Sequence, residues 1–308
     1  MHEFELIKNY FSKISKKNKS ALNLNDDIFF DKNKGIAISV DTYNIGYHFI
    51  DFKNPHLVIK KILRSSISDL ICKGVLPKFY FIAGSGNNKT FSKKNLSLIS
   101  KSLIQEQNKY NISLCGGDTT FSNKLSFTIT SLGYSKKIVY RNKALINDDI
   151  YVTGDLGDSF MGLQILKNKI KVSKELKKYF VQKYYLPDIR IKLTKKLLNF
   201  ANSSIDLSDG LIDDLSKMIN NQNLSFSLNE NKIPISKNLL KIIKMKNMKK
   251  IKLVSNGDDY QILFTASKDK SRIIAQTSKN LGIKISKIGK ICSNKKRSVI
   301  IDEKGKEI

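Results

Sequence analysis

Residues 205–215 read Ile-Asp-Leu-Ser-Asp-Gly-Leu-Ile-Asp-Asp-Leu, an acidic stretch around which the rest of the chain is organised. Its acidity runs against the composition of the protein, which has 55 Lys+Arg and 27 Asp+Glu. The apolar residues in and after its second half recur at helical spacing, which predicts an amphipathic helix over 210–220. Asp206 and Asp209 therefore belong to the turn that leads into this helix.

Acidic residues ahead of a helix have a structural explanation as well as a functional one. They can cap the free N–H groups of the first turn and suit the positive end of the helix dipole. Ser208 can cap the helix alone, however, which leaves Asp206 and Asp209 available for another role. Asp213 and Asp214 come one turn later, and we expect them on the polar, solvated face of the helix.

More aspartates stand at turns and strand ends elsewhere in the chain. They are Asp26, Asp27, Asp41, Asp69, Asp118, Asp258 and Asp259. Carboxylate oxygens are the protein ligands that hard divalent cations prefer. Several scattered carboxylates on one basic chain therefore predict a shared cation site built from oxygen ligands.

Local patterns indicate how some of these acids come together. Residues 24–30 and 36–40 read as two strands joined by a turn, with Asp27 early in the first and Asp41 directly after the second. In an antiparallel hairpin, these two positions lie at the same edge of the sheet. Asp69 falls near the buried stripe of a predicted helix, where a carboxylate is costly unless it has partners.

Two further motifs have both a structural and a functional explanation. Gly116 and Gly117 end a predicted strand just before Asp118, a pattern that suits either a tight turn or a phosphate with its cation. His48 lies in an irregular segment after an acidic strand end, where a structural histidine and a ligand-binding one both fit.

Length and composition limit the class of protein. A chain of 308 residues has room for about two domains, and we place them at 1–138 and 139–308, divided in a basic, irregular segment. The cysteines lack paired or zinc-binding spacing and indicate a reducing compartment. With no apolar leader and no membrane-length apolar run, we expect a soluble cytoplasmic protein without a membrane partner. The net charge of +28 suits anionic ligands, but the evenly spread lysines argue against a dedicated nucleic-acid groove.

Taken in order, the motifs resemble those of the thiamine-monophosphate kinase family. They are Asp26-Asp27, Ser39-Val40-Asp41-Thr42, Ser68-Asp69-Leu70, Gly116-Gly117-Asp118-Thr119-Thr120, Thr153-Gly154, Asp206-Leu207-Ser208-Asp209-Gly210-Leu211 and Gly257-Asp258-Asp259-Tyr260. No single motif is specific, but their order and spacing together are. The resemblance runs from about residue 4 to the C-terminus, and the family shares a superfamily with aminoimidazole ribonucleotide synthetase and selenophosphate synthetase.

The resemblance implies a fold and a reaction. The fold would be an α+β N-terminal domain followed by an α/β C-terminal domain, both PurM-like, with the N-terminal domains paired in a homodimer and the C-terminal domain closing over the site. The reaction would be ATP-dependent phosphorylation of thiamine monophosphate to thiamine diphosphate. The attacking phosphate oxygen is already an anion at neutral pH, so no general base is required, and several Mg²⁺ ions would assist by neutralising and aligning the phosphates.

The resemblance also implies roles for particular residues. The implied magnesium ligands are Asp27, Ser39, Asp41, Asp69, Asp118, Asp206 and Asp209. The implied ATP contacts are Gly117, Asp118, Arg141 and Ser208. His48 and Asp258 would face thiamine monophosphate.

The sequence departs from the family pattern at a few points, and other readings remain. The family usually has glycines where this chain has Asn23-Leu24-Asn25, an arginine where it has Phe121, and a glycine where it has Asn256. No aromatic tail follows the last strand. We therefore expect the largest differences from the family in the contacts with thiamine. One alternative is another ATP-using enzyme of the superfamily with a different small substrate. The other is a basic RNA-binding protein, which leaves the placed aspartates unexplained.

Overall fold

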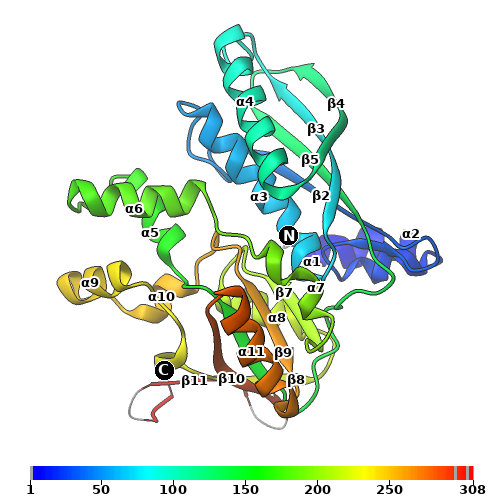
Figure 1. Ribbon diagram of the computed structural model, residues 1–308, viewed down its shortest axis with the longest axis vertical. Helices are drawn as coiled ribbons and strands as arrows, with labels where there is room; N and C mark the ends of the chain where they lie inside the picture. Colours follow the sequence, from blue (N-terminus) through cyan, green and yellow to red (C-terminus); the bar gives the residue numbers. More distant parts are fainter. Residues whose placement is uncertain (1–2, 295–296, 303–304, 308) are drawn as a thin grey trace.

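The computed structural model describes residues 3–294, 297–302 and 305–307, and its two sheets lie one above the other in Figure 1. The upper sheet has the strand order β1-β2-β5-β3-β4. Its strands are β1 (Phe29–Asp31), β2 (Ile36–Asn44), β3 (Pro77–Gly86), β4 (Ser113–Phe121) and β5 (Ser126–Tyr134). β3 and β4 are parallel, and the other neighbours are antiparallel.

Helices cover one face of the upper sheet. They are α3 (Pro55–Cys72) and α4 (Lys93–Tyr110). The helical N-terminal segment lies at the lower end of this sheet in Figure 1 and contacts β1; it consists of α1 (Glu3–Leu6), a π-helix (Ile7–Phe11), α2 (Ser12–Ser15) and a 3₁₀ helix (Lys19–Leu24). Most of α3 is buried because its apolar residues pack on the sheet on one side and on the second part of the chain on the other. That position brings Asp69 to the junction of the two parts.

The lower sheet is mixed, with the order β11-β8-β10-β6-β9-β7. Its strands are β6 (Asp149–Thr153), β7 (Ser203–Asp206), β8 (Leu224–Asn229), β9 (Ile262–Ala266), β10 (Ile285–Ser293) and β11 (Val299–Ile301). The helices between them are α5 (Asp158–Leu166), α6 (Lys174–Tyr185), α7 (Thr194–Leu197), α8 (Leu211–Met218), α9 (Lys237–Lys246), α10 (Lys250–Val254) and α11 (Ser271–Leu281), with 3₁₀ turns at Ile191–Leu193, Glu230–Lys232 and Lys268–Lys270.

The expected succession of an α+β part and an α/β part is confirmed by this architecture. The domain boundary expected at 138/139 stays a prediction; it falls in the chain between β5 and β6. Between α6 and β7 the chain forms a 3₁₀ turn and the short helix α7. In the described part of the chain, no helix is long and apolar enough to span a bilayer.

Candidate functional site

A polar cavity of about 540 Å³ lies where the two sheets meet. It brings together most of the residues that the sequence singled out. Those on its lining are Asp27, Asp41, His48, Asp69, Arg141, Asp206, Ser208, Asp209 and Asp258. We call it the acidic cavity.

The hairpin of β1 and β2 supplies the first two acids as expected. The strands are antiparallel with Phe29 opposite Ile38, so Asp27 and Asp41 come to the same edge of the sheet. Asp69 reaches the cavity from α3 and accepts a 2.6 Å hydrogen bond from Ser39 Oγ. Ser39 thus contacts the site through Asp69 and is buried behind it.

Three carboxylates of the cavity lining, Asp41, Asp69 and Asp206, form what we call the acidic trio; Asp206 is buried, and the other two are half-buried. Burial and then the charges of the other two raise the pKa of Asp69 well above its ordinary value. Burial raises the pKa of Asp206 to about 6, although a 2.6 Å hydrogen bond from Ser68 Oγ opposes the change. The pKa of Asp41 is raised by burial as well. Like charges held together away from water favour protonation or a bound cation.

Basic side chains neutralise the acids around the trio. Lys73 Nζ lies 2.8 Å from Asp26 Oδ1 and 3.3 Å from Asp27 Oδ2. The guanidinium of Arg141 donates through Nε to Asp27 Oδ2 at 3.0 Å and pairs with the other oxygen of Asp27. Asp209 is ion-paired with Lys217.

Close backbone packing fixes the turn of residues 206–210. Gly210 has φ +127°, and a Cβ there would lie 2.5 Å from the Ser255 carbonyl. A Cβ on Gly257 would lie 1.7 Å from Ser208 O. Glycine is therefore required where the turn and the 255–257 backbone meet, and this contact places Ser208 and Asp258 on one cavity wall.

The expectation for Asp214 is wrong. Its side chain is buried and accepts hydrogen bonds from the backbone N–H groups of Asp209 and Gly210, at 2.9 and 3.0 Å. It also pairs with Lys217 at 3.1 Å. Asp214 therefore folds back to cap α8, in place of Ser208, and helps to shape the turn that carries Asp209. Asp213 is exposed, as expected.

His48 and Asp258 line only the acidic cavity, whereas Arg141 and Lys217 line a second, neighbouring cavity as well. His48 Nδ1 accepts the backbone N–H of Asn44 at 2.9 Å, and burial lowers the pKa of the ring. The neutral ring therefore carries its proton on Nε2. Asp258 Oδ1 pairs at 2.9 Å with the buried Lys61, whose ammonium also lies 3.6 Å from the ring centroid of Tyr184.

The adjacent aspartate has a structural role. Asp259 is buried and accepts the backbone N–H groups of Gly157 at 2.7 Å and Ser159 at 3.3 Å, which lie at the start of α5. Burial raises the pKa of Asp259 to about 8. Of the two neighbours, Asp258 faces the cavity and Asp259 caps a helix.

Gly117 and Asp118 are not brought to the acidic cavity of the same chain. They lie on β4, which is exposed along its whole length at the edge of the upper sheet. The Asp118 side chain accepts the N–H of Thr119, its sequence neighbour, at 2.8 Å.

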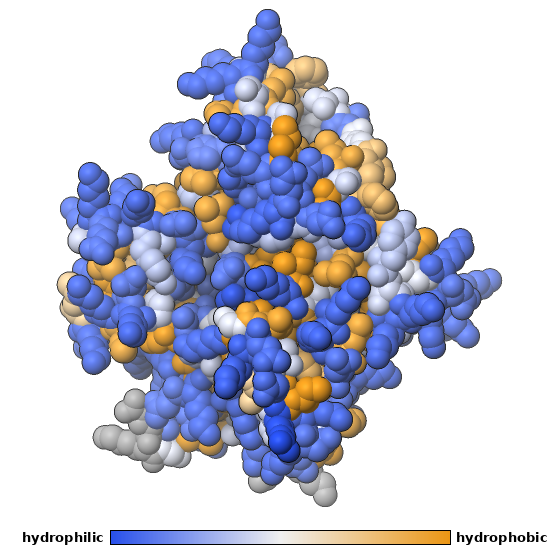
Figure 2. Space-filling view, viewed as in Figure 1, coloured by the Kyte–Doolittle hydropathy of each residue, from blue (hydrophilic) through white to orange (hydrophobic). Residues whose placement is uncertain are grey.

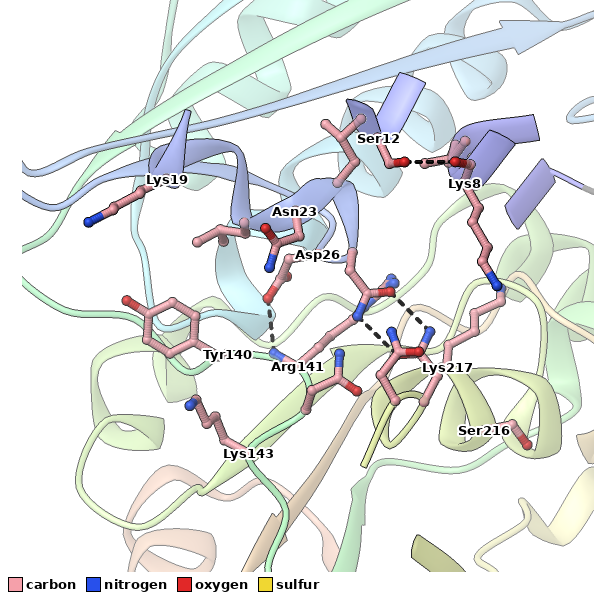
Figure 3. Close-up of a pocket in the computed structure, with 17 residues that line it drawn as sticks. Lys8, Ser12, Lys19, Asn23, Asp26, Tyr140, Arg141, Lys143, Ser216 and Lys217 are labelled. Atoms are coloured by element: carbon pink, nitrogen blue, oxygen red, sulfur yellow. Dashed lines mark hydrogen bonds between the residues drawn. The ribbon is translucent and has the colours of Figure 1, made fainter. Parts of the chain in front are cut away.

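A larger cavity of about 960 Å³ adjoins the acidic one, and Figure 3 shows its lining. The charged residues that the two cavities share are Asp26, Arg141 and Lys217, and both cavities also contact Ile7 and Leu24. The remaining basic side chains of the larger cavity are Lys8, Lys19 and Lys143. We call it the basic cavity. Sequence reasoning missed Lys217 and these lysines; the available signal for Lys217 was its place one turn after Asp213 and Asp214 on the same helix.

The comparisons with known proteins agree with this architecture. A family model described as AIR synthase related protein, N-terminal domain, matches residues 21–135. The solved structure of AaThiL complexed with AMPPCP and TMP matches the fold with a TM-score of 0.84 at 24% identity, covering 100% of this chain and 96% of that one. Residues 21–135 therefore form an N-terminal domain of the AIR synthase-related class, and the chain shares its fold with AaThiL.

Two relatives narrow the class to a family. The thiamine-monophosphate kinase of Buchnera aphidicola subsp. Acyrthosiphon pisum is 38% identical over 284 residues, covering 88% of this chain and 86% of the relative. That of Buchnera aphidicola subsp. Schizaphis graminum is 34% identical, covering 100% of this chain and 96% of the relative. The chain belongs to the thiamine-monophosphate kinase family.

Proposed function

We propose that the protein transfers the γ-phosphoryl group of ATP to thiamine monophosphate, giving thiamine diphosphate and ADP. The observation that carries the proposal is the acidic trio, which lines a cavity adjoining the basic one and forms no salt bridge with any residue that the structure describes. The family supports it through the names of its members, and AaThiL was solved with AMPPCP and TMP. Because ATP is the donor, we place the reaction in the cytoplasm.

The donor atoms fit divalent magnesium. The trio offers carboxylate oxygens, and ligand atoms of Asp27, Asp206 and the buried Cys72 all lie within 4.8 Å of one another. Burial, and after it the neighbouring negative charges, raise the pKa values of Asp69 and Asp206, and a bound cation would relieve this cost of the ionised form. Mg²⁺ prefers a few carboxylates together with phosphates and water. When bound, it supplies charge neutralisation to the two phosphate groups that must meet.

The proposed ligand set extends from this trio. Ser39 supports it through Asp69, and Asp27 and Asp209 stand on either side. Asp27 and Asp209 are paired with Arg141 and Lys217 in the nucleotide-free chain. We expect both bases to exchange these carboxylates for phosphate oxygens when ATP enters, which frees the two acids for the cations.

The chain's own residues then account for the transfer. Arg141, Lys217 and the exposed Ser208 lie at the junction of the two cavities, where they can hold the triphosphate. The nucleotide body occupies the basic cavity. An oxygen of the thiamine monophosphate phosphate forms the new bond to the γ-phosphorus, and the bond to the β–γ bridging oxygen breaks. That oxygen leaves on ADP. The attacking phosphate is already an anion, so no protein base has to remove a proton.

The acceptor lies at the His48 end of the acidic cavity. The Nε2–H group of His48 is available as a donor, and Asp258 provides a carboxylate toward the cationic thiamine rings. Lys61 beneath Asp258 holds that carboxylate in place. With the phosphate of the acceptor toward the trio, the two polyanions approach from opposite ends of one cavity.

A homodimer completes the proposal. Val40, Phe79 and Phe81 expose apolar side chains on the sheet face away from α3, and the edge strand β4 exposes Leu114 and Phe121. Figure 2 shows apolar surface gathered over this upper part of the molecule. Among the described residues, the outer edges of β4 and of the second half of β2 have no strand partner. Open edges of this kind favour pairing with a second chain.

Such pairing gives Gly117 and Asp118 a role. Asp41 lies on the open part of β2, so a partner chain whose β4 aligns there brings the partner's Asp118 toward the acidic trio. A mixture of Asp118→Asn and Asp206→Asn chains then regains activity that neither variant has alone, because one site in each mixed dimer keeps every acid. No recovery in demonstrably mixed dimers contradicts this shared site.

The proposed reaction is tested by measuring ADP formation with purified protein, ATP and Mg²⁺. We expect turnover with thiamine monophosphate and background rates with thiamine or with aminoimidazole-pathway substrates. Asp41→Asn and Asp206→Asn should reduce turnover close to background. Turnover with another acceptor, and none with thiamine monophosphate, contradicts the proposed substrate.

A further inference from the structure

Lys73 is a buried base at the acidic cavity that the proposed reaction does not use. It follows α3 directly, and its side chain is fully buried. Nζ lies 2.8 Å from Asp26 Oδ1 and 3.3 Å from Asp27 Oδ2, and it donates to Ser204 O at 2.7 Å. An ammonium group has three N–H donors, and these acceptors use all of them.

This geometry separates Lys73 from the other bases of the site. Arg141 and Lys217 line both cavities, so a phosphate can reach them. Lys73 lines neither cavity and has no donor left for a ligand. Its contribution is therefore a fixed positive charge held between two carboxylates.

The charges at the junction divide into two groups. Asp26 and Asp27 carry two negative charges, and Lys73 and Arg141 bring two positive ones. The acidic trio has no ion-pair partner within 4.0 Å among the residues that the structure describes. A divalent cation gains most where negative charge is uncompensated, because burial makes such charge costly.

We infer that Lys73 acts as a built-in cation that takes the place of a divalent ion at Asp26 and Asp27. In the nucleotide-free protein, divalent ions then bind at the acidic trio, and Asp27 is not among their ligands. Asp27 joins the metal site after Arg141 has turned to the nucleotide. The inference rests on the metal site of the proposed function but not on the identity of the acceptor.

The test counts bound Mn²⁺, which shares the oxygen-ligand preference of Mg²⁺. Protein without nucleotide is titrated with Mn²⁺, and free Mn²⁺ is measured by electron paramagnetic resonance. Asp27→Asn should bind the same number of Mn²⁺ ions as the unaltered protein, whereas the matched variant Asp41→Asn should bind fewer. Equal losses in Asp27→Asn and Asp41→Asn overturn the inference and leave the metal site intact. An unaltered protein that binds no Mn²⁺ overturns the inference and the metal site together.

A second pair of variants tests Lys73 itself. Lys73→Met removes the fixed charge and should raise the number of bound Mn²⁺ ions by one per chain. Lys73→Met combined with Asp26→Asn removes one charge of each sign, keeps the buried site balanced, and should return the number to that of the unaltered protein. If Lys73 only fills space, both variants bind the original number, which contradicts the inference. Thermal unfolding of each variant verifies that it is folded before the titration.

Discussion

Asp206→Asn should make the metal-free protein more stable while it abolishes the activity. The carboxylate is buried with Asp41 and Asp69, and its pKa is raised from 3.8 to about 6. Since a tenfold change in proton affinity is worth about 1.4 kcal/mol, this difference corresponds to about 3 kcal/mol. Asparagine removes the charge, and its carbonyl oxygen can still accept the hydrogen bond that Ser68 Oγ donates.

The size of this stabilisation by Asp206→Asn depends on pH. The folded protein binds the Asp206 proton more tightly than the unfolded chain does, so the side chain favours folding below about pH 4. That contribution to the stability of the folded protein is lost as the pH rises from about 4 through 6. At pH 8 the ionised carboxylate destabilises the folded protein by the full difference of about 3 kcal/mol. In EDTA at pH 8, Asp206→Asn should therefore unfold roughly 5 °C above the unaltered protein. At pH 4 the two proteins should unfold together.

Thermal unfolding by differential scanning calorimetry, with and without Mg²⁺, provides the assay. Mg²⁺ should raise the unfolding temperature of the unaltered protein at pH 8, and much less that of the variant, because binding to the folded state is what stabilises it. A variant that is less stable than the unaltered protein in EDTA at pH 8 refutes the reasoning. An undiminished response to Mg²⁺ also refutes it.

Three further substitutions test other parts of the site. Lys217→Met should raise the KM for ATP about tenfold or more, because a charged hydrogen bond to phosphate is worth roughly 1.5–3 kcal/mol. The KM for thiamine monophosphate should change little. Equal changes in both constants argue against a contact between Lys217 and phosphate. Tyr47 lies next to His48 on the lining of the acidic cavity and is 90% exposed. We expect its ring to stack on the thiamine rings, so Tyr47→Ala should raise the KM for thiamine monophosphate several-fold and Tyr47→Phe should not. Gly257→Ala puts a Cβ 1.7 Å from Ser208 O and should lower kcat by displacing the turn that carries Asp209; unchanged kinetics show that the packing is less tight than described.

Several features of the site could be predicted because they follow from short-range rules. The antiparallel hairpin brings Asp27 and Asp41 to one edge whatever the rest of the fold does. Asp69 stood out because an acid beside an apolar helical stripe needs partners, and it has them in Ser39 and the trio. The order and spacing of the motifs identified a resemblance to a known family, and that resemblance predicted the class of fold.

Other features depend on packing between distant segments. Helical periodicity could not show that the Asp214 side chain accepts hydrogen bonds from N–H groups of the preceding turn. The shape of that turn depends on its close packing against Gly257, which is distant in the sequence. The sequence does not distinguish Lys217 and Lys73 from the other basic residues, of which the chain has 55 in all. Their roles follow only from the ion pairs they form in the folded protein. The exposure of β4, which separates Asp118 from the trio, follows from strand order and cannot be read from a Gly-Gly-Asp motif.

The central claim is that the acidic trio and the adjoining basic cavity transfer one phosphoryl group from ATP to thiamine monophosphate. The most direct measurement follows both products in one reaction, with thiamine diphosphate and ADP separated chromatographically and quantified over time. The account predicts that they appear in equal amounts, that both require Mg²⁺, and that Asp206→Asn forms neither. ADP formed without a matching amount of thiamine diphosphate contradicts the account.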